Sequence, residues 1–395
     1  MKILQLCHKP PMPNVDGGCI AMSSLAKGLL KKGVSLKILT ASTEKHPFLP
    51  KEIPADFQSQ TSIENIFLDT RINVVDAFSA LVTSDSYNIS RFFSPDLDRR
   101  LIELLQENSY DIIHLESLFM TPYISTIREH SSAKIILRSH NLEHLIWERL
   151  ANSTGNKAKK MYLKHLAAKL KKYEQKTINE VDGIAAISNQ DSQRFLNFSC
   201  KKPIITIPFG VDLNRYQYDS TLRKGKMRLF HIGSMNWEPN KEGISWFVDE
   251  IWPIMEAADL EFHLAGRHMP TYLKKQSSEK FIVHGEIEDA QQFMQDYDIM
   301  IVPLLSGSGI RIKIIEAMAQ GKAIISTSIG AEGIAYEHNK NILIADSAKA
   351  IAKTAIELAA HPEKIHELGK NARALIESHY DNEKIMDNLL TFYRS

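Results

Sequence analysis

The chain has 395 residues, of which 44% are hydrophobic and 24% are charged, values that exclude extensive disorder. This length predicts two or three domains rather than one core. The 48 Lys and Arg residues balance 47 Asp and Glu residues, which argues against nucleic acid as a partner.

In the first half of the chain, short apolar runs alternate with amphipathic helical stretches. This alternation is typical of βαβ units, which form a parallel sheet. The pattern predicts strands at Lys2–Leu6, Ser35–Thr40, Asp111–Leu115, Lys134–Arg138, Gly183–Ile187 and Ile204–Ile207. It predicts helices at Ala21–Lys32, Asp96–Gln106, Lys157–Ile178 and Gln190–Phe195. The stretch from Thr43 to Pro95 shows no clear period, and an insertion is one interpretation of it.

Pro208 and Gly210 mark a linker, after which the same alternation begins again. Strands are predicted at Met227–Ile232, Leu260–Ala265, Phe281–His284, Ile299–Pro303, Ala323–Ser326 and Asn341–Ile344. Helices are predicted at Glu242–Ile251, Ala290–Gln295, Ile312–Gln320 and Ala348–Leu358. The sequence therefore predicts an α/β fold of two Rossmann-like, doubly wound domains at 1–208 and 209–381. A C-terminal helix at 382–395 is expected to pack back on the N-terminal domain.

Cellular location is indicated by three features. The three cysteines, Cys7, Cys19 and Cys200, include no Cys-x-x-Cys pair, so we expect a reducing compartment and neither disulfides nor a zinc site. The apolar start, Met1–Cys7, is too short for a signal peptide. No apolar run approaches the ~20 residues of a membrane span. These features predict a cytoplasmic protein.

The segment Tyr297–Gly321 carries the strongest chemical motif. A buried strand leads into the loop Ser306-Gly307-Ser308-Gly309, and a helix follows. Glycines let backbone N–H groups approach a phosphate, and a helix N-terminus adds its positive dipole end. Arg311 and Lys313 suit a diphosphate leaving group, and the Glu316 carboxylate suits a ribose diol. The alternative is that Arg311 and Lys313 are solvated charges and Glu316 is an ordinary carboxylate of the first helical turn.

The ending Glu316-Ala-Met-Ala-Gln-Gly321 resembles the signature of family 4 of the retaining glycosyltransferases, which have the two-domain GT-B fold. In that family a Glu-x7-Glu stretch ends in this way, whereas this chain has Ser308 at the first Glu position. It resembles instead a branch with Gly-Ser-Gly-x-Arg-x-Lys. The resemblance implies that two domains face each other across a cleft, that Arg311 and Lys313 hold the donor diphosphate in catalysis, and that Glu316 holds the ribose. Gly307, Ser308 and Gly309 are then expected to bind the donor.

A second loop follows the first strand of the second half. Its Gly-Ser-Met-x-Trp-x-Pro-Asn sequence resembles the same branch, so we expect Gly233, Ser234 and Asn240 near the diphosphate. Arg267, at the end of a later strand, is a further candidate for donor binding. The alternatives are an ordinary strand-to-helix connection and a surface charge.

In the first half, candidate site residues follow three of the predicted strands. Gly17 and Gly18 precede a helix, where their backbone suits an anion or a hydroxyl. Glu116 and Asn141 lie at strand ends on the edge where the acceptor is expected. Where many relatives have a functional His, this chain has Glu116, so we select His140 as the catalytic histidine. A hydrogen-bonded structural histidine is the alternative.

The helix at 157–176 is strongly basic, with eight lysines against the single acid Glu174. Leu163, Leu166, Leu170 and Tyr173 recur on one face. One interpretation is peripheral contact with the inner face of the cytoplasmic membrane. The other is a solvated basic face on a normally packed helix.

These features predict a metal-independent hexosyltransferase that retains the anomeric configuration. The donor is expected to be a UDP- or GDP-sugar bound as substrate, with no cofactor and no metal site. The acceptor is a sugar, glycolipid or glycan in cell-surface assembly. The alternatives are a GT-B nucleotide-sugar epimerase and a non-catalytic nucleotide-sugar-binding protein. An NAD-dependent oxidoreductase is disfavoured because neither half has Gly-x-Gly-x-x-Gly after its first strand.

Overall fold

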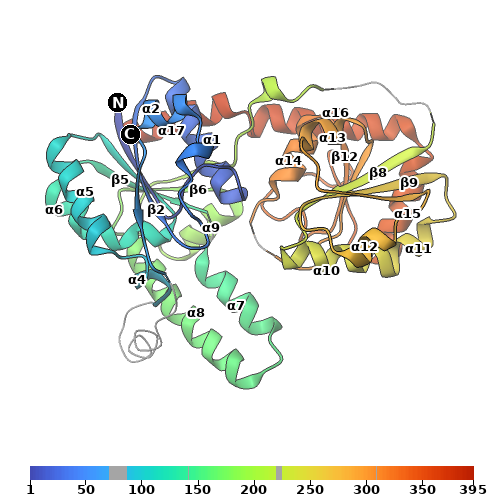
Figure 1. Ribbon diagram of the computed structural model, residues 1–395, viewed down its shortest axis with the longest axis horizontal. Helices are drawn as coiled ribbons and strands as arrows, with labels where there is room; N and C mark the ends of the chain where they lie inside the picture. Colours follow the sequence, from blue (N-terminus) through green and yellow to red (C-terminus); the bar gives the residue numbers. More distant parts are fainter. Residues whose placement is uncertain (71–86, 141, 219–224, 308) are drawn as a thin grey trace. The chain divides into compact units, whose positions relative to one another are not determined.

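The computed structural model describes residues 1–70, 87–140, 142–218, 225–307 and 309–395. The chain divides into two compact units (Figure 1). One consists of Met1–Gly210 together with Ile385–Ser395, and the other of Val211–Lys384. The first unit is therefore built from both ends of the chain, and the second from its middle.

The described part of the first unit contains a seven-stranded parallel sheet with the order β3-β2-β1-β4-β5-β6-β7. Its strands are β1 (Lys2–Cys7), β2 (Ser35–Ser42), β3 (Glu64–Phe67), β4 (Ile112–Glu116), β5 (Lys134–Ser139), β6 (Gly183–Ala186) and β7 (Ile204–Thr206). The order reverses direction between β1 and β4, where ligands of open α/β sheets bind. In register, Cys7 pairs with Glu116 and Glu116 with Arg138, so the three strands end side by side.

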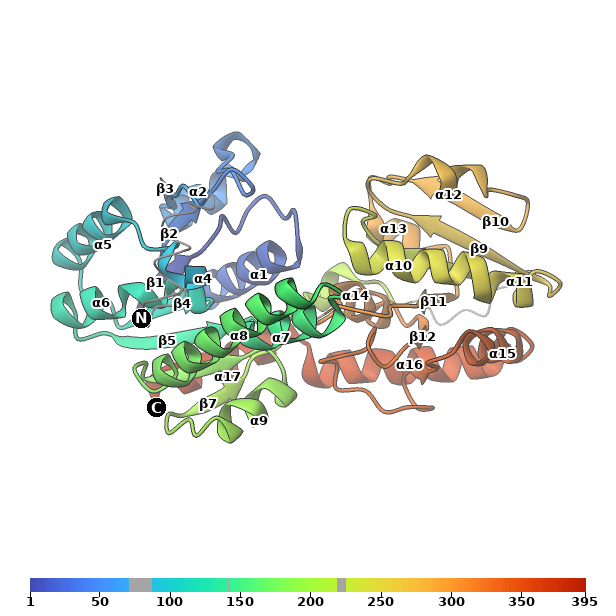
Figure 2. The ribbon, with the colours of Figure 1, turned by 90° about the horizontal axis from the view of Figure 1, so that it is seen from below.

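Helices cover both faces of this sheet. They are α1 (Gly17–Lys31), α2 (Ala55–Thr61), α4 (Tyr87–Ser90), α5 (Pro95–Glu107), α6 (Ile124–His130), α7 (Glu143–Ser153), α8 (Lys157–Thr177) and α9 (Asn189–Asn197), with 3-10 turns at Pro50–Glu52 and Leu118–Tyr123. One core cluster joins α5, α6, α8 and α9 to the sheet. The other joins α1 and the C-terminal helix α17 (Asn382–Arg394) to the sheet. Figure 2 shows the same elements from below. Five side chains of α17 are buried: Ile385, Met386, Leu389, Leu390 and Tyr393.

The described part of the second unit contains a six-stranded parallel sheet with the order β10-β9-β8-β11-β12-β13. Its strands are β8 (Met227–Ile232), β9 (Leu260–Ala265), β10 (Phe281–Gly285), β11 (Ile299–Val302), β12 (Ala323–Ser326) and β13 (Leu343–Ile344). The helices are α10 (Glu238–Trp246), α11 (Trp252–Met255), α12 (Thr271–Lys275), α13 (Ala290–Gln295), α14 (Ile312–Ala319), α15 (Ala348–Ala359) and α16 (Pro362–His379). A π-helical turn, Phe247–Ile251, separates α10 from α11, and a 3-10 turn lies at Leu213–Arg215. Here the order reverses between β8 and β11.

The predicted fold class is confirmed: both units are Rossmann-like α/β domains with parallel sheets. The strands β8, β9 and β12 have the predicted bounds. The strands and helices that periodicity did not predict are β3, α2, α4, α6, α7, α11, α12 and α16. Among the described helices, none combines the length and the apolar character needed to cross a membrane.

Candidate functional site

Glu116, the last residue of β4, is the centre of a polar cluster at the carboxyl edge of the first sheet. Its side chain is fully buried. Oε1 accepts a hydrogen bond of 2.7 Å from Gln5 Nε2, and Arg138 Nη1 lies 3.5 Å from the same oxygen. Oε2 lies 2.6 Å from His140 Nε2. The predicted residues Glu116 and His140 therefore contact each other directly, because their strands are neighbours that end in register.

The C-terminal helix α17 contributes to this cluster through Tyr393. The Tyr393 hydroxyl lies 2.5 Å from His114 Nδ1, and both side chains are buried. His114 Nε2 in turn lies 3.5 Å from Glu116 Oε1. Tyr393, near the end of the chain, thus contacts His114, which lies beside the Glu116 carboxylate. The sequence pattern did not indicate this contact.

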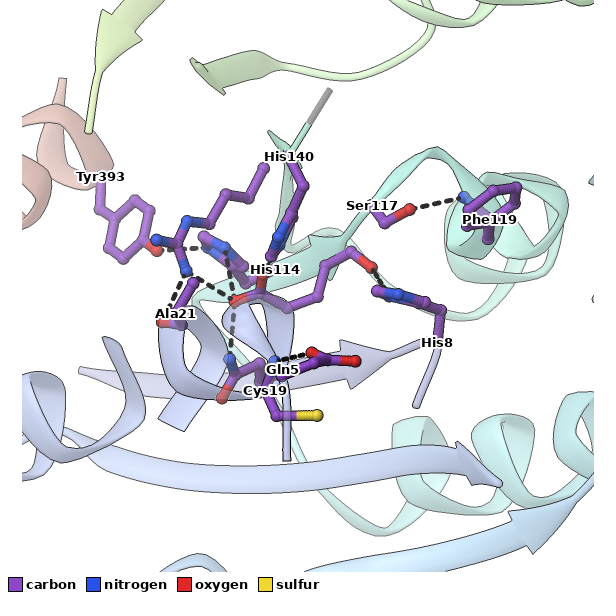
Figure 3. A network of polar contacts seen from close by, with 12 residues as sticks. Gln5, His8, Cys19, Ala21, His114, Ser117, Phe119, His140 and Tyr393 are labelled. Atoms are coloured by element: carbon purple, nitrogen blue, oxygen red, sulfur yellow. Dashed lines mark hydrogen bonds and ion pairs between the residues drawn. The ribbon is translucent and has the colours of Figure 1, made fainter. Parts of the chain in front are cut away.

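His8 is a further histidine of the edge that sequence reasoning missed. Its Nδ1 lies 2.9 Å from the backbone oxygen of Glu116, so Nδ1 carries the proton and donates. His140 in the same way donates from Nε2 to the Glu116 carboxylate. The two rings lie 6.1 Å apart at 78° (Figure 3). In neutral His8 the remaining nitrogen, Nε2, has a lone pair that can accept a hydrogen bond from a hydroxyl. The signal in the sequence was a histidine directly after the first strand.

Burial and neighbouring charges set the protonation of this cluster. Burial alone would raise the pKa of the Glu116 carboxyl, but Arg138, His140 and His114 outweigh it and hold that pKa well below its ordinary value. Burial lowers the pKa of His8 to about 3, with His140 and Lys9 acting in the same direction. Burial also lowers the pKa of His114 to about 4. At neutral pH the cluster therefore holds an ionised carboxylate, with His8 and His114 both neutral.

The predicted Gly17 and Gly18 form the first turn of α1. Asp16 caps this helix by accepting a hydrogen bond of 2.9 Å from Cys19 N, and Lys9 Nζ pairs with Asp16 at 2.6 Å. A Cβ at Gly18 would lie 2.9 Å from Lys9 Nζ, so glycine leaves room for this ion pair. The helix N-terminus thus has an acidic residue and a lysine beside it. The predicted Asn141 and Ser308 lie outside the described residues.

In the second unit, the glycine loop after β11 leads to Arg311 at the start of α14. Gly307 and Gly309 have φ values of 115° and 81°, a left-handed conformation that favours glycine. Arg311 Nη1 donates to the backbone oxygen of Gly309. The Arg311 guanidinium lies 5.1 Å from the centre of the Trp237 ring, within cation–π range. A Cβ at Gly307 would approach both Arg311 and Trp237, at 2.9 Å and 3.3 Å.

One turn further along α14, Lys313 Nζ lies 2.8 Å from Glu316 Oε2. The other oxygen, Oε1, accepts a hydrogen bond of 2.9 Å from the Tyr216 hydroxyl. Glu316 is 8% exposed, and burial beside this carboxylate raises the pKa of Tyr216. Lys313 therefore pairs with Glu316 in this structure, and Tyr216 is a contact that the sequence pattern did not indicate.

The loop after β8 approaches the glycine loop through Trp237. Asn240 Nδ2 donates to Ser234 O at 2.9 Å, which closes the loop on itself. A Cβ at Gly233 would lie 2.6 Å from Asn240 Nδ2, so a larger residue there would displace the Asn240 side chain. Arg267 differs from the other candidates: its side chain is 59% exposed and lies 3.3 Å from Glu286. The structure thus brings Gly307, Gly309 and Arg311 together with Trp237, and Lys313 with Glu316.

Two family models match the chain. Residues 16–215 match the model described as Glycosyltransferase Family 4, and residues 226–361 match the model described as Glycosyl transferases group 1. A curated relative of Klebsiella pneumoniae, an uncharacterised 44.6 kDa protein in the cps region, is 26% identical over 306 residues. This match covers 73% of the chain and 76% of the relative.

Solved structures share the fold of the whole chain. Sucrose-phosphate synthase from Thermosynechococcus elongatus superposes with a TM-score of 0.73 at 16% identity, covering 100% of this chain and 98% of that one. HepE of Anabaena, in complex with UDP, gives a TM-score of 0.67 at 13% identity, covering 99% of both chains. At these identities the likeness shows the fold alone.

Proposed function

The chain belongs to glycosyltransferase family 4, and on that premise we propose that it transfers a hexose from a nucleoside diphosphate sugar to a hydroxyl group. The observation that carries this proposal is the arrangement around Arg311. A guanidinium stacked on Trp237 lies at the start of α14, beside a loop that two left-handed glycines shape. No side chain among the described residues caps the start of α14. Backbone N–H groups and a fixed cation together suit a diphosphate.

For the donor we propose a UDP- or GDP-sugar, bound as substrate without a metal ion. Arg311 and the loop glycines would hold the diphosphate. Lys313 lies 2.8 Å from Glu316 in the present structure, so a bound donor would compete for both side chains. A diphosphate would attract Lys313, and a ribose diol would hydrogen-bond to Glu316 beside Tyr216. HepE, which has the same fold, is known with UDP bound, and this supports a uridine nucleotide as the first donor to test.

The proposed reaction breaks the bond between the anomeric carbon and the diphosphate oxygen and forms a bond to the acceptor oxygen. The acceptor proton passes to the leaving diphosphate, so no protein nucleophile is required. Arg311, Lys313 and the start of α14 stabilise the negative charge that develops on the leaving group. Resemblance to the retaining family supports retention of configuration. In the first unit, His140 would orient a sugar hydroxyl, and the buried Glu116 would hold the His140 ring in place.

The acceptor is proposed to be a sugar, glycolipid or glycan in polysaccharide assembly on the cytoplasmic side of the membrane. Support for this role comes from the Klebsiella pneumoniae relative in the cps region. A lipid-linked acceptor would require membrane contact, for which the helix at 157–176 is one candidate.

The donor site is tested by calorimetry with a panel of UDP- and GDP-sugars and with NAD. We expect one nucleotide sugar to bind the wild type and to bind at least tenfold more weakly to Arg311→Ala, Lys313→Ala and Glu316→Ala. Lys353→Ala is the control, because this exposed lysine of α15 lies elsewhere on the same unit. Equal binding to the three variants, or binding of NAD instead, would show that the donor site is wrongly assigned.

Turnover distinguishes the proposal from its two alternatives. Nucleotide release that depends on an added acceptor, with an anomerically retained product seen by NMR, supports a retaining transferase. Conversion of the donor to an epimer without acceptor would identify an epimerase. Donor binding with no turnover on any acceptor would identify a binding protein.

A further inference from the structure

The helices α7 and α8 form an antiparallel hairpin that leaves the body of the first unit (Figure 1). Its base is fixed by Glu174 of α8, which is buried. Glu174 accepts hydrogen bonds from the backbone N–H groups of Glu143 and His144, at 2.9 Å and 3.2 Å, and it pairs with the His144 ring. These contacts hold the two helices of the hairpin together at its base.

The apolar stripe of α8 is not available to a membrane. Leu163, Leu166 and Leu170 are buried, at 4%, 9% and 0% exposure. Tyr173 packs on the core and its hydroxyl bonds to Thr121 at 2.8 Å. The interpretation in which α8 lies flat on a membrane through this stripe is therefore wrong, because the stripe packs within the protein.

The outer end of the hairpin has a different surface. Three large apolar side chains are exposed there: Leu150 at 45%, Met161 at 73% and Tyr162 at 41%. Leu150 precedes the turn at 154–156 and Met161 and Tyr162 follow it, so at ~1.5 Å per residue all three lie within about 10 Å of the turn along the helix axes. Folding thus leaves a small apolar group at the hairpin end instead of burying it.

Four lysines lie in the same part of the hairpin. Lys157, Lys159, Lys160 and Lys164 all lie in the first eight residues of α8, a stretch without an acidic residue. The described part of the chain gives none of these four an ion-pair partner. We use the name hairpin tip for Leu150, Met161, Tyr162 and these four lysines.

We propose that the hairpin tip docks on an anionic lipid bilayer, with the three apolar side chains inserted at the interface and the four lysines on the headgroups. Apolar insertion combined with attraction of lysines to anionic lipid is the chemistry of peripheral membrane contact. A polyanion in solution would satisfy the lysines but not the exposed Met161. A second copy of the chain would bring like charges together. The inference does not depend on the donor assignment.

The test is co-sedimentation of the full chain with vesicles of phosphatidylcholine mixed with phosphatidylglycerol, compared with pure phosphatidylcholine. We expect binding to the mixed vesicles only, and we expect added NaCl to weaken it. Replacing Lys157, Lys159, Lys160 and Lys164 together by Ala should lower partitioning by about tenfold or more. Met161→Ser with Tyr162→Ser should lower it about fivefold.

Two controls match these variants. The exposed lysines Lys274, Lys275, Lys349 and Lys353, replaced together by Ala, give the same change in net charge on the second unit. Ile254→Ser with Tyr272→Ser removes side chains of 44% and 49% exposure. Both controls should bind vesicles like the wild type, and circular dichroism checks that every variant is folded. Equal loss in the controls, undiminished binding of the tip variants, or a wild type that binds no vesicles would each overturn the proposal.

Discussion

At the carboxyl edge of the first sheet, the polar side chains are buried and bonded to one another, with Glu116 at 0% exposure. At the corresponding edge of the second sheet, the cations lie on a glycine loop and a helix start, and the Lys313 side chain is 37% exposed. The first arrangement fixes which atoms donate and accept before any ligand arrives. The second leaves charges that a ligand can reach. We call the carboxyl edge of the first sheet the rigid edge and that of the second sheet the adaptable edge. Substitutions can test each edge separately.

The largest expected effect is on the rigid edge. Glu116→Gln removes the carboxylate and leaves the Arg138 guanidinium, which is 2% exposed, without its counter-charge. We expect the free energy of unfolding to fall by about 3–5 kcal/mol, the usual consequence of breaking a buried ion pair. The measurement is hydrogen exchange of the β4 and β5 amides, which reports the first unit alone.

Glu107→Gln is the control for this change, because Glu107 lies in the same unit. Glu107 also pairs with a cation, Arg100 at 3.6 Å, but its side chain is 57% exposed. Surface pairs contribute little, so we expect a change below about 0.5 kcal/mol. Equal effects of the two substitutions would show that Glu116 does not hold the rigid edge together.

Acid is expected to weaken the rigid edge through its histidines. The pKa of His114 is lowered from 6.5 to about 4 in the folded chain, so between these pH values the unfolded chain binds more protons. The contribution of His114 to the free energy of unfolding is therefore fully present above pH 6.5. It decreases by about 3 kcal/mol as the pH falls toward 4. His8, with its pKa lowered to about 3, acts in the same direction.

His114→Gln should reduce the loss of stability between pH 6.5 and pH 4 by about 3 kcal/mol. This expectation holds whatever the substitution does to stability at pH 7. The readout is again exchange of the β4 and β5 amides, because the second unit has its own acid-sensitive histidine, His231, with its pKa lowered to about 4. His165→Gln, at an exposed position of the first unit, is the matched control. An unchanged slope in His114→Gln would exclude His114 as a source of the acid sensitivity.

The smallest expected effect is on the adaptable edge. Trp237→Ala removes the ring under Arg311, a contact of about 1 kcal/mol, so we expect nucleotide-sugar affinity to fall about fivefold. Trp237→Tyr should restore most of this loss because a smaller aromatic face remains. Stability should change little, since Trp237 is 37% exposed. Tyr272→Ala, 49% exposed, serves as control; a similar loss there would rule out a specific role for the Trp237 ring.

Sequence reasoning succeeded where one local pattern decides the structure. β9 and β12 are short apolar runs between polar turns, and their bounds were predicted correctly. Glu116 and His140 were expected at one edge because parallel strands end together. By contrast, α16 alternates few apolar residues with many charges, so periodicity gave no prediction. Its buried Ile365, Leu368, Ala372 and Ile376 show the helical spacing only in retrospect.

Contacts that join distant parts of the chain were beyond the sequence pattern. Nothing local to His114 indicates that its partner is Tyr393. The stacking of Arg311 on Trp237 depends equally on two loops that follow different strands. Such contacts are set by tertiary packing, which amphipathic periods and motif spacing do not encode. The roles of Arg311, Lys313 and Glu316 in donor binding stay predictions until ligands are tested.

The contribution of residues 385–395 to the first unit has a consequence for biosynthesis. A ribosome produces residues 1–210 first, but their fold is complete only when α17 has been made. Until then the apolar face that includes Ile112 and Ile136 stands uncovered, and His114 lacks the Tyr393 hydroxyl. The second unit is continuous in sequence, so it can fold as it emerges. The unit that is translated first is therefore the one that finishes folding last.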